Sequence, residues 1–344
     1  MAIETIDHSR APLWDEYVMR APDATFYHEY RWRSMLESVY KLKTRYLAEV
    51  DGDRITGILP LAEFKGLRGP RSLVSLPYSN YGGVVADSQP VADALVAAAR
   101  NIMEKERFSL LELKQDTPCS DQSFVENLDY FALAMPLDPD PDVIWKKSLN
   151  TKARNQVRKA EKSGLTVEIG AHLWQEFLNV YRVNQRDLGT PTHATTWYRK
   201  LAETYADDMS VILIRKGDEA VAGGWSFHFK DTAVLQYAAS KREHLRLCPN
   251  NLAYWAGIEH MCRKGVKLFD FARSRRDSGT FHFKQQFGAV PRQTHYQYLL
   301  NTASAAPDLN QDDAKIKLIV ATWRKLPLGV ANTIGPHLRR RLST

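Results

Sequence analysis

The segment NNLAYWAGIEHMCRKGVKLFDFARS, residues 250–274, predicts a helix that leads directly into a strand. Apolar side chains recur at helical spacing up to a Lys-Gly turn, and a short apolar run rich in phenylalanine follows. The segment VADALVAAARNIMEKERFSLLELKQ, residues 91–115, has the same order. When the two segments are aligned on the methionine near each helix end, Glu112 falls opposite Asp270. The chain therefore carries this helix–strand unit twice.

A β-hairpin pattern precedes each of these units. In the first copy, residues 45–64 form two strand patterns joined by an Asp-Gly-Asp turn. In the second copy, residues 211–229 form two strand patterns joined by a Lys-Gly-Asp turn. A third strand pattern follows each hairpin, at residues 71–79 and 233–240. The repeated order predicts an α/β fold in two copies of about 150 residues, each a mixed central sheet flanked by helices.

The segment PLDPDPDVIW, residues 136–145, separates the two copies. Three prolines and three aspartates in so short a span disfavour a continuous helix or a central strand. We therefore predict an N-terminal domain at residues 1–137 and a C-terminal domain at residues 138–302. Residues 303–344 read as a basic, amphipathic helical extension that ends in the sequence LRRRLST.

Composition narrows the classes of partner and compartment. The net charge of +7 favours an anionic partner, such as a phosphate-rich carrier, RNA or a membrane surface, without choosing among them. Cys119, Cys248 and Cys262 lack the spacing of a zinc site, so we expect no metal and a reducing compartment. No signal peptide and no apolar run of about 18 residues is present. We expect a cytoplasmic protein, with peripheral contact at the inner face of the membrane as an open alternative.

The segment at residues 146–164 is the most cationic part of the chain. An apolar stripe at helical spacing, formed by Leu149, Ala153, Val157 and Ala160, predicts a helix with one buried side. Arg154, Arg158 and Lys159 would then lie on its exposed side. A solvated helix face explains this pattern as well as a phosphate-binding arm, in which arginine grips a phosphate with two donors.

Three loops present polar groups that suit a binding site. The helix pattern before Gly189 breaks there and places Asp187, Thr190 and His193 on a loop, where Asp187 or His193 could accept a proton. Helix capping and a surface turn explain the same residues. The loop LPYSNYGGVV contains Tyr78 and Asn80 beside two glycines that let backbone approach a ligand. Asn250 or Asn251 is the expected N-cap of the second-copy helix.

The stretch FDFARSRRDSGTFHFKQQFG, residues 269–288, combines a buried-looking acid with a cationic cluster. Asp270 lies in an apolar strand, so we expect a cationic or hydroxyl partner, for which Arg273 is the nearest candidate. Ser278 or Asp277 would cap a following helix. Lys284 lies among phenylalanines, where it either extends to solvent or is held in a pocket.

Four of these stretches resemble the FemAB-like branch of the GNAT acyltransferase superfamily. They are KARNQVRKAEKSGLTV, the GTP turn at residues 189–191, PNNLAYWAGIEHMCRKGVKLFDFARS and DSGTFHFKQQFGA. The resemblance covers most of residues 10–300 and is most specific over residues 150–290. It implies tandem GNAT-like domains and, in the better-known members, transfer of an amino acid from aminoacyl-tRNA to the amine of a peptidoglycan precursor. Chain length and hinge position are similar to those of FemAB-related proteins of exopolysaccharide and exosortase loci.

The resemblance also implies roles for single residues. Phe283 and Lys284 match the family's Phe-Lys pair near the transferred group and the substrate phosphate. Tyr237 lies in the strand whose tyrosine lines the same cleft. The chain lacks the long helical hairpin that the peptidoglycan enzymes insert in the second domain. It also lacks glycine in KREHLRLCPNN, where acyl-CoA enzymes of the superfamily cradle a diphosphate on a glycine-rich loop, and this favours aminoacyl-tRNA or another carrier as donor.

We therefore expect an acyl or aminoacyl transferase without a tightly bound cofactor, acting on an anionic, carrier-linked or small-molecule amine. Lys284 is expected to stabilise the developing oxyanion or the acceptor phosphate, with Asp187 and Asp270 as proton acceptor and orienting acid. The residues expected to bind substrate are Phe283, Tyr237, Arg273, Arg154, Arg158, Lys159, Thr190, Asn250, Tyr78 and Asn80. An acyl-CoA-dependent N-acyltransferase and a non-catalytic protein that binds RNA or a membrane surface remain alternatives; DNA is not an expected partner.

Overall fold

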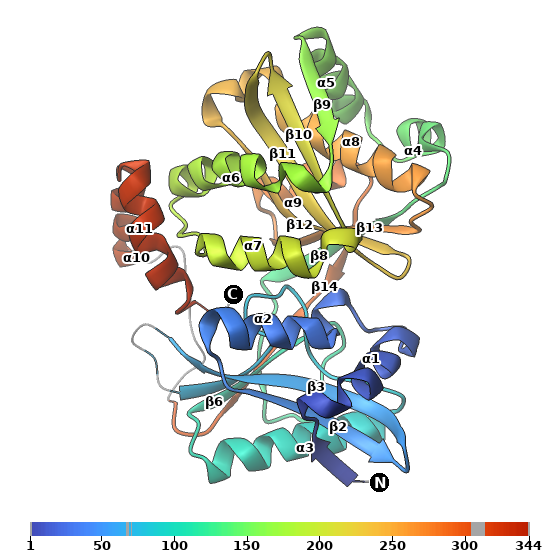
Figure 1. Cartoon of the computed structure of the whole chain (residues 1–344), viewed down its shortest axis with the longest axis vertical. Coiled ribbons are helices and arrows are strands. Elements are labelled where there is room, and N and C mark those ends of the chain that lie inside the picture. Colours follow the sequence, from blue (N-terminus) through green and yellow to red (C-terminus); the bar gives the residue numbers. More distant parts are fainter. Residues whose placement is uncertain (1, 67–68, 70, 304–313, 343–344) are drawn as a thin grey trace. The chain divides into compact units, whose positions relative to one another are not determined.

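The computed structural model describes residues 2–66, 69, 71–303 and 314–342, which form two compact units. Unit 1 comprises Met1–Tyr130, Gln293–Leu309 and Leu338–Thr344, and unit 2 comprises Phe131–Arg292 and Asn310–His337. Each unit is a mixed sheet flanked by helices, as the sequence predicted (Figure 1). Within the described ranges, no helix combines the length and the apolar character that crossing a membrane requires.

Unit 1 is built on an eight-stranded sheet with the order β1-β2-β3-β4-β6-β15-β7, in which β5 also pairs with β3. Its strands are β1 (Ala2–Thr5), β2 (Thr44–Asp51), β3 (Arg54–Lys65), β4 (Arg71–Ser75), β5 (Val85–Ala86), β6 (Leu110–Gln115), β7 (Val125–Asn127) and β15 (His295–Leu300). Its helices are α1 (Ala11–Arg20), α2 (Tyr30–Tyr40) and α3 (Gln89–Lys105). The buried side of α3 packs on the sheet through Leu95, Val96 and Ala99.

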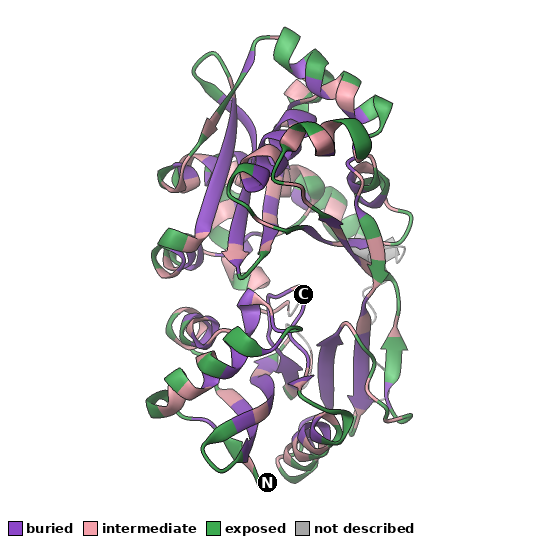
Figure 2. Ribbon diagram, turned by 90° about the vertical axis from the view of Figure 1, so that its right-hand side faces the viewer, coloured by how far each residue is buried: buried purple, intermediate pink, exposed green. Residues whose placement is uncertain are grey.

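Unit 2 is built on a seven-stranded sheet with the order β14-β8-β13-β12-β11-β10-β9. Its strands are β8 (Tyr130–Pro136), β9 (Leu165–Ile169), β10 (Met209–Lys216), β11 (Glu219–Phe229), β12 (Thr232–Ser240), β13 (Leu268–Arg275) and β14 (Val290–Gln293). Its helices are α4 (Pro141–Lys147), α5 (Thr151–Lys162), α6 (Trp174–Leu188), α7 (Thr195–Thr204), α8 (Pro249–Arg263), α9 (Gly279–Gln285), α10 (Ala314–Arg324) and α11 (Leu328–Arg339). The central strands are largely buried (Figure 2).

Apart from β5, the strands of the two sheets correspond in order, which confirms the predicted duplication. In unit 1, β4 pairs in parallel with β6, and Val74 is the partner of Glu112. In unit 2, β12 pairs in parallel with β13, and Val234 is the partner of Asp270. The two acids therefore occupy equivalent places, as the sequence alignment indicated.

The strand that completes each sheet comes from the other half of the chain. In unit 1 the place beside β6 is taken by β15, which follows the whole of the second copy and pairs with β6 in antiparallel fashion. In unit 2 the corresponding place beside β13 is taken by β8, which precedes the second copy. Residues 293–302, which the sequence placed in the second domain, thus belong to unit 1. The predicted extension is likewise divided between the units.

The stripe predicted from residues 146–164 is confirmed as core. Leu149, Ala153, Val157 and Ala160 are each at most 2% exposed and join the hydrophobic cluster that α5 and α8 share. The opposite face of the sheet is covered by α6, which packs on β11 and β12. Gly223 of β11 permits this approach, because a Cβ there would overlap the carbonyl oxygen of Ile212 and crowd the ring of Phe177.

Leu299 provides a test of the strand exchange. This β15 side chain is 4% exposed and belongs to the core of unit 1. We expect Leu299→Ala to lower the free energy of unfolding of unit 1 by about 2–4 kcal/mol, because it leaves a cavity. Val125→Ala, in β7 of unit 1 at a position that is 49% exposed, should change it by less than about 0.5 kcal/mol. Urea denaturation of both variants measures this, and equal effects would contradict the assignment.

Candidate functional site

The parallel pairing of β12 with β13 ends early. It comprises three residue pairs and stops at Val234 and Asp270. Beyond these residues β12 continues to Ser240 and β13 to Arg275, outside this pairing. Ligands in α/β proteins bind at the carboxyl ends of strands where neighbouring strands diverge. A ligand site in unit 2 is therefore expected at this opening between β12 and β13.

A cavity of about 290 Å³ lies at the N-terminal end of α8. α8 begins at Pro249, and Cys248 before it has a left-handed backbone with φ of 58°. α5, the loop before α8, α8 itself and α9 all contribute side chains to the cavity, among them Lys152, Gln156, Cys248, Asn250, Phe283 and Gln286. The N-terminal end of a helix carries partial positive charge, and Lys152 adds a cation. The cavity therefore suits an anionic group.

The two asparagines at the start of α8 have separate positions. The buried Asn251 donates from Nδ2 to Oε1 of Gln156 over 3.1 Å and ties α8 to α5. Both Asn250 and Asn251 line the cavity, and the predicted binding role of Asn250 stays a prediction. The prediction that one of them caps α8 was wrong, because the N-cap is Cys248 and its side chain makes no capping hydrogen bond. Pro249 fits the first turn, which needs no N–H there.

Lys284 is buried rather than extended to solvent. It is 6% exposed, and its Nζ donates to the backbone carbonyls of Ala272 over 3.1 Å and Arg273 over 3.0 Å. Burial lowers the pKa of Lys284 to about 8; the Asp270 carboxylate opposes this shift and the Arg273 guanidinium reinforces it. The neighbouring Phe283 lines the cavity. α9 thus turns Phe283 toward the cavity and Lys284 toward β13.

Asp270 shapes the end of β13. Its side chain is 7% exposed, and Oδ1 accepts a hydrogen bond of 2.7 Å from the backbone N–H of Ala272. Ala272 has a positive φ of 57°, a conformation unfavourable for a residue with a Cβ. The carboxylate therefore holds a turn whose carbonyl group is in turn held by Lys284. Asp270 and Lys284 fix the backbone at the edge of the opening.

Residues 147–285 match the family model described as the acetyltransferase (GNAT) domain. This part of unit 2 is similar to a GNAT domain and is called the GNAT domain below. No curated protein matches the chain in sequence. The site described above, from α5 to α9, lies within the matched range, except that Gln286 follows its last residue.

Solved structures extend the likeness to both units. FemX superposes with a TM-score of 0.65 at 14% identity, over 88% of this chain and 98% of that one. A tandem GNAT protein from the clavulanic acid biosynthesis pathway gives 0.58 at 13% identity, over 89% and 100%. The C-terminal domain of a putative lysylphosphatidylglycerol synthetase from Agrobacterium fabrum gives 0.57 at 12% identity, over 91% and 96%. At these identities the likeness establishes the tandem fold.

The cations predicted to bind substrate on α5 of the GNAT domain do not line the cavity. Arg154 donates from one guanidinium nitrogen to the carbonyls of Trp145, Lys146 and Leu149 at the end of α4. Arg158 lies over the ring of Trp145, 5.4 Å from its centre, and Lys159 is exposed. The α5 residues that line the cavity are Lys152 and Gln156, which the sequence reasoning missed.

Asp187, Thr190 and Tyr237 lie on elements of the GNAT domain outside the cavity lining. Asp187 forms an ion pair of 2.6 Å with Nε of Arg186, and Thr190 is exposed after the left-handed Gly189. Tyr237, in β12, is 8% exposed, and its hydroxyl accepts from Nε1 of Trp197 over 3.2 Å. The position of Tyr237 on the part of β12 beyond the pairing keeps it a candidate for the opening.

Tyr78 and Asn80 belong to unit 1, where both have structural contacts. The hydroxyl of the buried Tyr78 donates to the carbonyl of Arg340 over 2.8 Å. Asn80 donates from Nδ2 to the hydroxyl of Tyr27 over 2.7 Å. The glycines after them serve packing, because a Cβ at Gly83 would lie 2.5 Å from the side chain of Gln115. These contacts explain the loop without a ligand.

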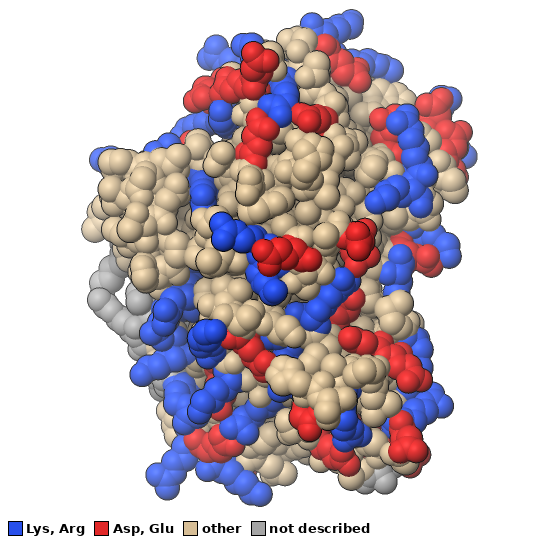
Figure 3. Space-filling model, in the orientation of Figure 1, with Lys and Arg blue, Asp and Glu red and all other residues tan. Residues whose placement is uncertain are grey.

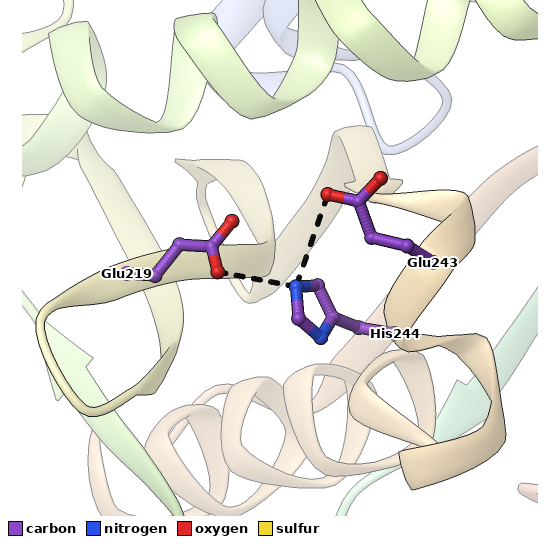
Figure 4. A group of neighbouring side chains, drawn as sticks. All are labelled: Glu219, Glu243 and His244. Atoms are coloured by element: carbon purple, nitrogen blue, oxygen red, sulfur yellow. Dashed lines mark ion pairs between the residues drawn. The ribbon is translucent and has the colours of Figure 1, made fainter.

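Glu219, Glu243 and His244 form the one group of acidic and imidazole side chains with metal-like spacing within the described residues (Figure 4). Nε2 of His244 lies 3.2 Å from Glu219 and 3.9 Å from Glu243. Nζ of Lys241 already lies 2.5 Å from Glu219, and this hydrogen bond lowers the pKa of that carboxyl. We assign the group as an ion-pair network that holds the loop before α8 against the β11 hairpin.

Lys284 makes the stability of the GNAT domain depend on pH. Because its pKa falls from 10.5 to about 8 on folding, the unfolded chain binds the extra proton between these values, and stability rises with pH across that window. We expect the free energy of unfolding of the wild type, minus that of Lys284→Met, to increase from pH 8 to about pH 10 by on the order of 2 kcal/mol.

Urea denaturation at the two pH values measures this difference. Lys159→Met, at an exposed position on the same domain, is the matched control, and its difference from the wild type should stay constant. A constant difference for Lys284→Met as well would place the Lys284 amine in a solvated environment.

Proposed function

We propose that the chain is an acyl or aminoacyl transferase that forms an amide on an amine of a cell-envelope or exopolysaccharide precursor. The observation that carries this proposal is the juxtaposition made by α9. Phe283 lines the cationic cavity at the start of α8, while Lys284 binds the backbone of β13 at the edge of the strand opening. An anionic carrier held in the cavity would leave its acyl carbonyl near that opening.

The chemistry requires one bond to form and one to break. The neutral amine of the acceptor attacks the ester or thioester carbonyl of the donor, and its nitrogen loses a proton to a base. Asp187 and Asp270 remain the candidates for that base and for an orienting acid. The tetrahedral oxyanion then collapses and expels the oxygen or sulfur of the carrier. Lys284 has three N–H donors, of which two bind carbonyls, so one is left for the developing charge.

The loop before α8 supports a donor other than acyl-CoA. It folds as the 3₁₀ helix η5 (Arg242–Leu247), in which the N–H of His244 binds the carbonyl of Lys241. The N–H of Cys248 likewise binds the carbonyl of Leu245. These amides are occupied, and no glycine allows a close approach of backbone to a diphosphate. The lysylphosphatidylglycerol synthetase neighbour, named for an aminoacylated lipid, supports aminoacyl transfer. Acyl-CoA stays the second candidate, because the structure of the tandem GNAT neighbour is described as one without AcCoA, a molecule of that class.

Transfer from two labelled donors tests the proposal. We expect the purified protein to form an amide from aminoacyl-tRNA or from acyl-CoA with an amine acceptor, and Lys284→Ala to lower the rate constant by about 100-fold or more, in line with loss of an oxyanion donor. Circular dichroism checks that the variant is folded. Near-normal turnover by a folded Lys284→Ala would remove Lys284 from the mechanism, and absence of transfer from both donors would contradict the proposed function.

Lys152 and Lys159 form a matched pair on α5. Both are exposed lysines, but only Lys152 lines the cavity. We expect Lys152→Ala to raise the KM for the donor about fivefold, which corresponds to loss of about 1 kcal/mol from one solvated contact with an anion. Lys159→Ala should change it by less than about twofold. Equal effects on KM would place the anionic part of the donor outside the cavity.

A further inference from the structure

The C-terminal helices of unit 2 expose large apolar side chains. On α10, Leu318 is 69% exposed and Ile319 is 65% exposed, and on α11, Val330 is 41% and Ile334 is 44% exposed. We call these four residues the C-terminal apolar patch. Figure 3 shows almost no charged atoms, and no acid, over α11, which lies in front of α10 in that view. Large apolar side chains exposed on neighbouring helices are a feature of surfaces that contact a partner or a membrane.

The opposite sides of the same helices are anchored, so the patch is their outer face. Trp323 of α10 is 7% exposed and Ala331 of α11 is 4% exposed. Val320 of α10 packs directly on Gly189, where an added Cβ would lie 2.5 Å from Cγ1 of Val320. The guanidinium of Arg186 donates to the carbonyl of Leu326 over 3.1 Å. α10 and the turn after it are thus fixed to the end of α6, and Gly335 of α11 lies close to Thr192 and Trp323.

The charged residues in the unit 2 part of this C-terminal segment are of one sign. Residues 314–337 contain four lysines and arginines and no aspartate or glutamate. Lys317, Arg324 and Lys325 belong to α10 or follow it directly, and all three are exposed. A surface that combines protruding aliphatic side chains with cations fits a partner that is anionic at its face and apolar beneath it.

We propose that the C-terminal apolar patch docks on the surface of an anionic lipid bilayer. The aliphatic side chains would enter the region between head groups and acyl chains, and Lys317, Arg324 and Lys325 would contact the anionic head groups. A second copy of the chain fits less well, because a two-fold contact brings the same patch, and so the same cations, together. RNA also fits less well, since its bases stack on aromatic rings rather than on leucine or isoleucine. This inference does not depend on the proposed transfer reaction.

Flotation with lipid vesicles tests the proposal on the full chain. We expect the wild type to float with phosphatidylcholine vesicles that contain phosphatidylglycerol, less so with phosphatidylcholine alone, and less at high salt. Leu318→Asp with Ile319→Asp should lower the partition coefficient at least about tenfold, because both apolar insertion and the local charge are changed. Circular dichroism verifies the fold, and Val330→Asp with Ile334→Asp replaces this variant if its helices do not form.

A matched control separates the patch from net charge. Met19 and Val290 are 56% and 64% exposed and lie outside the patch, so Met19→Asp with Val290→Asp changes net charge equally and should float like the wild type. Equal flotation of wild type and the patch variant would overturn the proposal. It would also be overturned if the wild type failed to float and the patch variant instead lost RNA binding, or changed from dimer to monomer in light scattering.

Discussion

The candidate site depends on the hydrogen bonds by which the buried Asp270 and Lys284 hold the backbone at the end of β13. Asp270 accepts from the N–H of Ala272, which has a positive φ, and Lys284 binds the carbonyls of Ala272 and Arg273. A buried charge without a partner costs free energy. Asp270 and Lys284 are therefore each stabilised by the opposite charge of the other and by these hydrogen bonds to the backbone. Their joint effect is to fix the backbone where β13 leaves β12, and the cavity at α8 is built against the helix that carries Lys284.

The corresponding end of the β4–β6 pair in unit 1 is held by different contacts. Glu112 is the counterpart of Asp270, but its neighbouring lysine is Lys114 on the same strand, and Nζ of Lys114 binds the carbonyl of Leu76 after β4 over 3.2 Å. The backbone N–H of Lys114 also binds the hydroxyl of Ser75. The strands that diverge in unit 2 are therefore bridged by side chains in unit 1.

Sequence reasoning located what short-range patterns determine. The hairpins, the helix before each parallel strand and the equivalence of Glu112 with Asp270 follow from periodicity and turns. The strand exchange could not be predicted in this way, because β15 and β6 lie far apart in the sequence. The residue pattern of a strand does not show which other strand pairs with it. Periodicity also identified the exposed side of α5 without showing which residues face another element. Lys152 and Gln156 were missed for that reason, and Arg154, expected to bind phosphate, caps α4 instead.

The burial of Lys284 narrows the kind of catalysis that this residue can perform. With two of its three donors bound to carbonyls, its head group is fixed in position and cannot swing toward a ligand. A fixed donor is an advantage only for charge that develops at one place, because preorganised groups stabilise a transition state without reorganisation. A pKa of about 8 also leaves most of the amine charged at neutral pH. Under the proposed function, Lys284 is therefore better suited to stabilise an oxyanion than to accept the proton of the attacking amine.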